Sequence, residues 1–177
     1  EEKLLNVGTN EWQQFNDTTD VFYAVNATKV IKQIREISPD VLYINGILSV
    51  QYNFIPLLLF KFRSHTPKIV IAPRGMLQKG ALAIKPFKKK VYLLAFKILR
   101  LHKKVHWHAT DEQEIEDIRS TFGRKTRITL APNIPDSNKY LQMNGEKKPG
   151  ELKLATISLI TIKKNFDFLI QILSDRK

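Results

Sequence analysis

The sequence predicts an α/β fold built around a doubly wound parallel sheet, and two observations support this prediction. Short runs rich in β-branched and aromatic residues alternate with longer stretches whose apolar residues recur every three or four positions. The stretches between successive runs are long enough to hold the crossover helices that parallel strands need. Because ligands bind beyond the carboxyl ends of the strands in such sheets, the loops that follow the strands are the first candidates for a site.

Five short segments are predicted as strands. They lie at residues 21–25, 41–44, 68–72, 105–109 and 127–131. The loops in which a ligand site is expected follow four of them, at residues 45–49, 73–79, 110–114 and 132–136.

The helices between these strands are predicted from their periodicity and their ends. Asn26 can cap a helix that Pro39 stops, and residues 54–62 are apolar nearly all round, as in a buried helix. Thr110 is expected to cap a further helix over 111–121, whose first turn carries the acidic residues that a helix dipole favours.

The longest predicted helix covers residues 81–101. Its apolar residues at spacings of four and three are expected to form an inward stripe of Phe87, Val91, Leu94, Ile98 and Leu101. Most of its lysines fall away from that stripe, so they are expected to face the solvent.

The chain is predicted to hold one domain and the beginning of another. Residues 1–136 form the first domain, whose first strand is expected to be missing, and the polar stretch 137–150 is typical of a linker. A strand over 152–159 and a helix over 164–173 would then begin a second domain. We therefore expect a fragment of a longer cytoplasmic protein.

Composition narrows the possible functions. The 177 residues include no cysteine, which excludes a disulfide framework, a Cys-ligated zinc or iron–sulfur site, and a Cys nucleophile. No apolar run is long enough for a spanning helix. No glycine-rich phosphate loop, paired-His metal motif or serine elbow occurs. His106 and His108 are interpreted as packed or surface residues, and the run 17–20 is interpreted as a loop. No metal site is therefore predicted.

The net charge of +12 is concentrated in the middle of the chain. Residues 41–110 hold thirteen Lys and Arg and no Asp or Glu, whereas the remainder of the chain is nearly balanced. Such a field attracts phosphate esters, anionic bilayers or nucleic acid. The strongest cluster, Lys85, Lys88, Lys89 and Lys90, predicts an interfacial helix on anionic lipid, and the competing interpretation is a core-packed helix with a basic outer face.

Arg74 is a candidate on physical grounds. It lies in the turn 73–76 at a predicted strand end, beside Gly75, which permits a close backbone approach to a ligand. A side-chain cation and free amides could converge there on an anion. A turn arginine that simply makes a surface salt bridge is the competing interpretation.

The order of several motifs resembles the family 4 (group 1) glycosyltransferases of GT-B fold. The matching stretches are 39–46 (PDVLYING), 72–77 (APRGML) with Ala81, Leu82 and the lysines behind it, 108–110 with Glu114, and 131–135 (APNIP). The resemblance covers about residues 20–177. It implies a retaining, metal-independent transferase that moves a sugar from a nucleotide-diphosphate sugar to a lipid-linked or glycan acceptor in bacterial surface polysaccharide synthesis.

The resemblance also assigns residues. Arg74 takes the catalytic position at the cleft, where many relatives carry histidine. The acceptor side is assigned to Asn45, Gly46, Gly75, Met76, Thr110 and Glu114. The donor side is assigned to Lys164, Asn165 and Asn133, and Leu159 stands where the family has a phosphate-binding arginine. No cofactor beyond the nucleotide-sugar co-substrate is expected.

A transferase at the cytoplasmic face of an anionic membrane is therefore the main expectation, and this chain alone is expected to be inactive. The alternative is a non-catalytic basic module that binds anionic membrane or nucleic acid. A nucleic-acid partner is less expected, because aromatic residues scarcely interleave with the lysine cluster.

Overall fold

The computed structural model describes residues 8–61, 66–134, 150, 154–157 and 164–174. It divides the chain into two compact units, Glu1–Pro132 and Asn133–Lys177, which are described separately.

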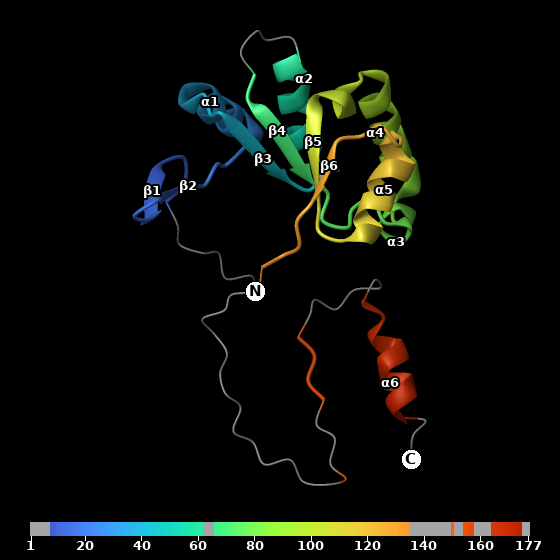
Figure 1. Cartoon of the computed structure of the whole chain (residues 1–177). Helices are drawn as coiled ribbons and strands as arrows, with labels where there is room; N and C mark the ends of the chain where they lie inside the picture. Colours follow the sequence, from blue (N-terminus) through green and yellow to red (C-terminus); the bar gives the residue numbers. More distant parts are fainter. Residues whose placement is uncertain (1–7, 62–65, 135–149, 151–153, 158–163, 175–177) are drawn as a thin grey trace. The chain divides into compact units, whose positions relative to one another are not determined.

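A four-stranded sheet forms the centre of the first unit (Figure 1). Its strands are β3 (Val41–Asn45), β4 (Lys68–Ala72), β5 (Val105–Ala109) and β6 (Ile128–Leu130). They pair in parallel in the order β3-β4-β5-β6, which confirms the predicted α/β class with a parallel sheet. In this sheet, each strand lies beside the strand that follows it in the sequence. The described strands therefore do not include the point at which the strand order reverses in a doubly wound sheet.

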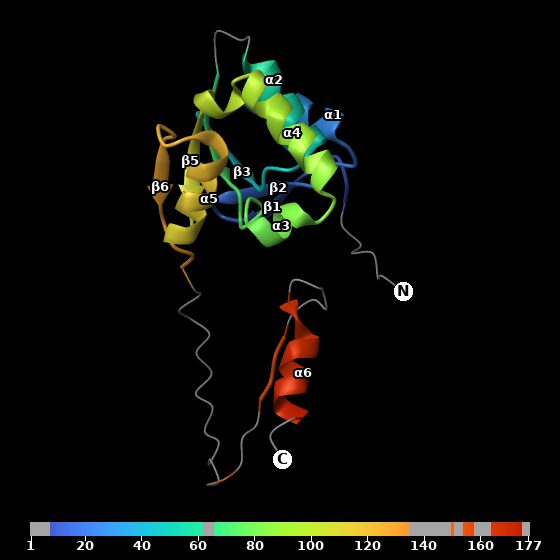
Figure 2. The same cartoon turned by 90° about the vertical axis from the view of Figure 1, so that its right-hand side faces the viewer.

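Helical segments connect the strands. A π-helical turn, η1 (Val50–Phe54), leads into α2 (Ile55–Lys61) between β3 and β4. The β4–β5 connection holds α3 (Lys79–Ala83), α4 (Pro86–Ile98) and the 3₁₀ turn η2 (Leu101–Lys104), and α5 (Glu112–Phe122) joins β5 to β6. Figure 2 looks onto this helical side, with α4 and α5 nearer the viewer than the strands.

The core lies between these helices and one face of the sheet. Strand residues such as Ile71 and Trp107 pack in one cluster with Phe60 of α2, Phe96 of α4 and Ile118 of α5. Side chains alternate along a strand, so the neighbouring positions point to the opposite face. There, Val41, Tyr43 and His106 are exposed among the described residues. The sheet therefore offers accessible side chains, although parallel sheets are usually covered on both faces.

An aromatic group fixes how α4 packs. The ring of Phe96 lies 5.7 Å from Phe122, 6.0 Å from Tyr92 and 6.5 Å from Trp107. Trp107 in turn stacks on Phe122 with ring centroids 4.6 Å apart. Phe96 and Trp107 are fully buried. Large aromatic side chains contribute most of the energy of a core, so this group determines which side of α4 faces inward.

Two predictions about the 81–101 helix are wrong. The segment is broken at Ile84, which is extended, and Lys85, which has φ +52°, and Pro86 then begins α4. The predicted inward stripe faces outward as far as Ile98, and only Leu101 of that set is buried. Two apolar stripes at helical spacing exist in this sequence, and the stripe that contains the aromatic ring of Phe96 is the one that packs.

A short antiparallel hairpin precedes the sheet. It consists of β1 (Trp12–Asn16) and β2 (Thr19–Phe22). The predicted parallel strand 21–25 is therefore wrong, and the predicted loop 17–20 is reduced to a turn whose last residues already belong to β2. Asn16 Oδ1 accepts hydrogen bonds from the backbone N–H and the hydroxyl of Thr18, which stabilises that turn.

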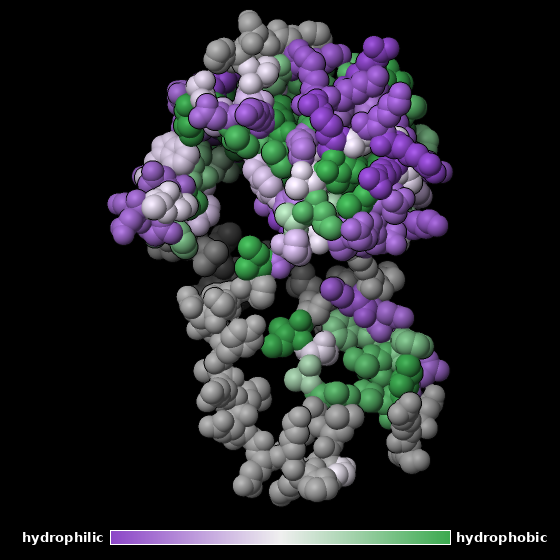
Figure 3. All heavy atoms as spheres, in the orientation of Figure 1, coloured by the Kyte–Doolittle hydropathy of each residue, from purple (hydrophilic) through white to green (hydrophobic). Residues whose placement is uncertain are grey.

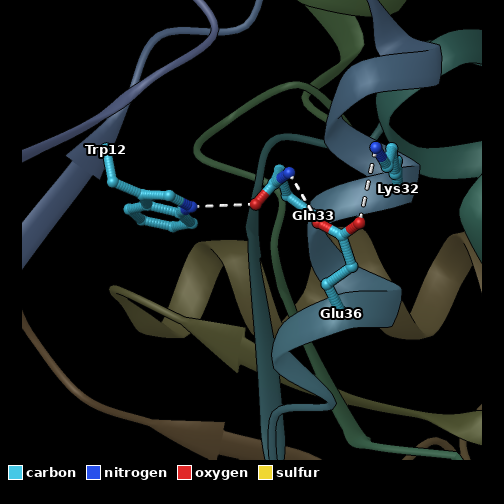
Figure 4. Close-up of polar contacts among 4 residues, drawn as sticks. All are labelled: Trp12, Lys32, Gln33 and Glu36. Carbon is cyan, nitrogen blue, oxygen red and sulfur yellow. Dashed lines mark hydrogen bonds and ion pairs between the residues drawn. The ribbon is translucent and has the colours of Figure 1, made fainter.

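The hairpin is tied to α1 (Ala27–Ile37), as Figure 4 shows. The indole N–H of Trp12 donates to Gln33 Oε1 at 2.8 Å, and Gln33 donates to Glu36, whose carboxylate lies 3.5 Å from Lys32. The predicted cap of α1 is confirmed, because Asn26 Oδ1 accepts from the backbone N–H of Lys29.

The second unit contains one described helix, α6 (Phe166–Ser174). Its apolar side chains are exposed, and Figure 3 shows the helix as a hydrophobic patch. Residues 154–157 of the predicted strand 152–159 have no regular secondary structure, and the remainder of that strand lies outside the described residues. No described helix is long and apolar enough to cross a membrane.

Candidate functional site

The carboxyl ends of β3, β4 and β5 bring most of the predicted site residues of the first unit to one edge of the sheet, which we call the rim. Asn45 pairs with Ala72 in register, and the backbone N–H of Gly46 donates to the Ala72 carbonyl at 2.7 Å. Strands β3 and β4 therefore end at the same level. Arg74, two residues beyond β4, donates from Nε to Asn45 Oδ1 at 3.2 Å.

Arg74 holds an uncommon backbone conformation at this edge. Its φ is +54°, in the left-handed region that residues with a Cβ rarely adopt. Such strain persists only where the surroundings impose it, and it is concentrated at functional sites. The neighbouring Gly75 also has a positive φ, so the chain turns sharply and leaves the guanidinium exposed at the rim.

A directed hydrogen-bond chain extends from Arg74 across the sheet. Arg74 donates to the hydroxyl of Tyr43 at 3.1 Å, and that hydroxyl lies 2.6 Å from His108 Nδ1. His108 Nε2 lies 2.8 Å from the carbonyl oxygen of Ala131. A carbonyl can only accept, so Nε2 carries a proton, and in a neutral imidazole Nδ1 then accepts from Tyr43. We refer to Asn45, Arg74, Tyr43 and His108 as the rim network.

Glu114 lies beneath the rim rather than on it. It is 2% exposed, and its Oε1 accepts from the backbone N–H of Gly75 at 2.7 Å. Its Oε2 accepts from the backbone N–H and the hydroxyl of Thr110, at 2.8 and 2.9 Å. With three donors in place, Glu114 links the turn after β4 to the end of β5. The predicted contact between Glu114 and an acceptor therefore does not fit this position, and Glu114 positions the loops instead.

The cap of α5 also differs from the prediction. Asp111, not Thr110, is the N-cap, because Asp111 Oδ1 accepts from the backbone N–H of Glu114 at 2.7 Å. The hydroxyl of Thr110 is occupied by the Glu114 carboxylate instead. Both Thr and Asp are favourable N-cap residues, so residue type alone does not show which of the two caps α5. The direction in which the chain leaves β5 decides it.

Gly46 and Met76 lie against each other. Gly46 is buried with φ +83°, and a Cβ at this position would stand 2.8 Å from Met76 Cε. Met76 Sδ accepts from the backbone N–H of Ile47 at 3.4 Å, and the rest of the Met76 side chain is partly exposed. Of these two predicted acceptor residues, only Met76 presents a side chain to solvent, and Gly46 provides the space beneath it.

Two polar side chains that the sequence analysis did not identify, the buried Asn53 and the partly buried Tyr92, fix the loop after β3. Asn53 donates to the Gly46 carbonyl at 3.3 Å and accepts from the backbone N–H of Ser49 at 3.0 Å. The hydroxyl of Tyr92 donates to the Ile47 carbonyl, and burial raises the pKa of this phenol. Tyr92 therefore remains neutral and acts as a donor that ties α4 to the loop.

Tyr43 and His108 of the rim network were also missed. The signal that could have found them is the alternation along β3 and β5, which places both on the face opposite the core and near the carboxyl ends. His106 shares that face but bonds to Thr129 Oγ1 at 2.7 Å. Among the described residues no three His, Asp or Glu side chains lie close enough to hold a metal ion.

The predicted donor residues belong to the second unit. Lys164, Asn165 and Asn133 are exposed, and Asn165 has φ +48° just before α6. Leu159 lies outside the described residues. A depression of about 450 Å³ in the first unit is lined by Ser38, Pro39 and Lys68, among others, at the amino ends of β3 and β4, the edge opposite the rim.

Searches against family models, curated proteins and solved structures find no match to this sequence. The chemistry of the rim must therefore be judged from its groups. It presents a fixed cation at Arg74, the amide of Asn45, and a phenol held by an imidazole. Such a set suits a polyhydroxylated or anionic ligand, because hydroxyls need donors and acceptors together and phosphates need a planar cation.

Proposed function

We propose that the rim is the acceptor side of a metal-independent, retaining sugar transferase. The donor is a nucleotide-diphosphate sugar, and the acceptor is a lipid-linked or glycan hydroxyl. The support comes from the motif resemblance together with the rim network, in which an exposed arginine is held by Asn45 and Tyr43 at the carboxyl edge of a parallel sheet.

The single observation that carries the proposal is the position of Arg74. Departure of a nucleoside diphosphate develops negative charge, and in the absence of a metal the protein must supply the compensating cations. Asn45 and Tyr43 orient the guanidinium of Arg74 before any ligand arrives, so little reorganisation is needed. Preorganised donors of this kind stabilise a transition state far more than mobile ones.

Tyr43 and His108 are positioning residues in this proposal. The phenol accepts from Arg74 and donates to His108, and the Ala131 carbonyl fixes the tautomer of the imidazole. Loss of the Tyr43 hydroxyl would leave the guanidinium with a smaller set of partners and more freedom. The assignment of Lys164, Asn165 and Asn133 as donor residues is part of the proposal and is supported by the motif resemblance alone.

The test is sugar transfer by the natural protein that contains this sequence, with a panel of nucleotide-diphosphate sugars and lipid-linked or glycan acceptors. Arg74→Ala is expected to lower kcat/KM about tenfold or more, and Tyr43→Phe by a smaller factor. Arg35→Ala, an exposed arginine on α1, is the matched control and should leave transfer unchanged. Equal kinetics for Arg74→Ala and the parent would remove Arg74 from the site, and the absence of transfer from every donor would overturn the proposal.

A further inference from the structure

The outer face of α4 carries an apolar stripe that no described residue covers. Phe87, Val91, Leu94 and Ile98 are 77%, 51%, 58% and 69% exposed. Their spacing of four, three and four places them on one line along the helix. Scattered exposed apolar residues are ordinary, but four in a row on one helix mark a surface that binds something.

Lysines border this stripe on both sides. At 100° per residue, Lys88 lies on one side of it and Lys90 and Lys97 lie on the other. All three are exposed, and α4 contains no acidic residue. Lys89, by contrast, is half-buried, and its ammonium donates to the Ala81 carbonyl. The basic surface therefore differs from the predicted cluster, because Lys85 precedes the helix as its N-cap residue, Lys89 turns inward and Lys97 joins. We call the four apolar residues and these three lysines the α4 face.

We propose that the α4 face lies flat in the headgroup region of an anionic lipid bilayer. The stripe would enter the boundary of the acyl chains, while the flanking lysines extend along it to the phosphates. The helix of 13 residues is about 20 Å long at 1.5 Å per residue, so it can lie on a bilayer but not cross it.

The combination of charge and apolarity selects this partner over others. A second copy of the chain would bring two lysine-bordered faces together, with no acid on either α4 to offset the repulsion. Nucleic acid would satisfy the lysines but leave Phe87, Leu94 and their neighbours in water. An anionic bilayer satisfies both parts of the face at once.

The experiment is sedimentation of the full chain with vesicles of phosphatidylcholine alone and of phosphatidylcholine mixed with phosphatidylglycerol. Binding is expected to the mixed vesicles, much less to the neutral ones, and to weaken in high salt. The double variant Phe87→Ser/Leu94→Ser should lower the partition coefficient by about tenfold or more. The triple variant Lys88→Gln/Lys90→Gln/Lys97→Gln should lower it by about 100-fold.

Matched controls separate the α4 face from general charge and stickiness. Val25→Ser/Ile37→Ser removes two exposed apolar residues elsewhere, and Lys29→Gln/Lys68→Gln/Lys125→Gln removes the same charge elsewhere. Both controls should bind mixed vesicles nearly as the parent chain does. Circular dichroism confirms that each variant is folded. An additional Phe87→Trp variant should show a blue shift in fluorescence with mixed vesicles only.

Several results would overturn the proposal. One is that the chain does not bind the mixed vesicles. Another is that the Val25→Ser/Ile37→Ser control lowers the partition coefficient as much as the Phe87→Ser/Leu94→Ser variant does. A third is a doubled mass in sedimentation equilibrium that the α4 variants abolish. Binding to an oligonucleotide that depends on both lysines and stripe would also do so. Because vesicle binding is measured without donor or acceptor sugar, its failure is independent of any failure of the transferase proposal.

Discussion

Replacement of Glu114 by alanine should destabilise the first unit and release the rim from its support. The carboxylate accepts three hydrogen bonds, two of them from the backbone N–H groups of Gly75 and Thr110. Each buried donor that loses its partner costs about 1–3 kcal/mol. Because both residues are only half-buried, water can replace part of the loss. We therefore expect the free energy of unfolding to fall by about 3 kcal/mol, a large part of the 5–15 kcal/mol typical of a domain.

The glutamine variant provides a sharper comparison. In the Glu114→Gln variant the side chain keeps its shape, but the new NH₂ group must face the backbone N–H of either Gly75 or Thr110. Two donors then face each other, so that hydrogen bond is lost. The expected loss is about 2 kcal/mol. Glu116→Gln on the same helix is the control, because Glu116 is exposed and pairs with Arg119 at the surface, so its effect should stay within about 0.5 kcal/mol.

Urea unfolding followed by the fluorescence of the buried Trp107 measures these differences. Native-state hydrogen exchange supplies a local readout, because the amides of Gly75 and Thr110 should exchange faster in both Glu114 variants than in the Glu116 control. An alanine variant whose stability lies within about 0.5 kcal/mol of the parent, with both amides unchanged, would refute the idea that Glu114 supports the rim.

Two further predictions concern Gly46 and His102. Gly46→Ala should lower the free energy of unfolding by about 1–2 kcal/mol, because φ is +83° and the new methyl would displace Met76, and urea unfolding that matched the parent would contradict this. Burial lowers the pKa of His102, as do Lys103 and Lys97 more weakly, against a backbone hydrogen bond with Phe96. The unfolded chain therefore binds this proton more tightly, so this contribution to stability is complete above about pH 6.5 and is lost as the pH falls below that value. A His102→Gln chain should show a flatter dependence in urea unfolding between pH 5 and 7.5, and an unchanged slope would count against it.

The four strands of the parallel sheet and the loops at their ends could be predicted from sequence, because the signal is local. A β-rich run that is buried on one side and bounded by Gly, Pro or Asn, such as the one ending at Asn45, specifies a strand end without reference to the rest of the chain. Parallel pairing then places the ends of β3, β4 and β5 at one edge. The same pairing brings Asn45 and Arg74 to that edge.

The side of a helix that packs could not be predicted in the same way. The segment around α4 has two apolar stripes at helical spacing, and only the fit of Phe96 between Trp107 and Phe122 decides between them. Packing depends on volumes contributed by distant segments, which a local period does not contain. The orientation of Lys89 follows from the same choice.

By itself, the sequence determined an α/β class with parallel strands, the strand ends that carry Asn45, Arg74 and Thr110, and a centre without acidic residues. Only the tertiary structure decided that Glu114 is buried beneath the rim, that Tyr43 and His108 are connected to Arg74, and that the apolar stripe of α4 faces outward. The first set follows from periodicity and charge along the chain. The second depends on which side chains meet across strands and helices, and no residue's neighbours in sequence determine that.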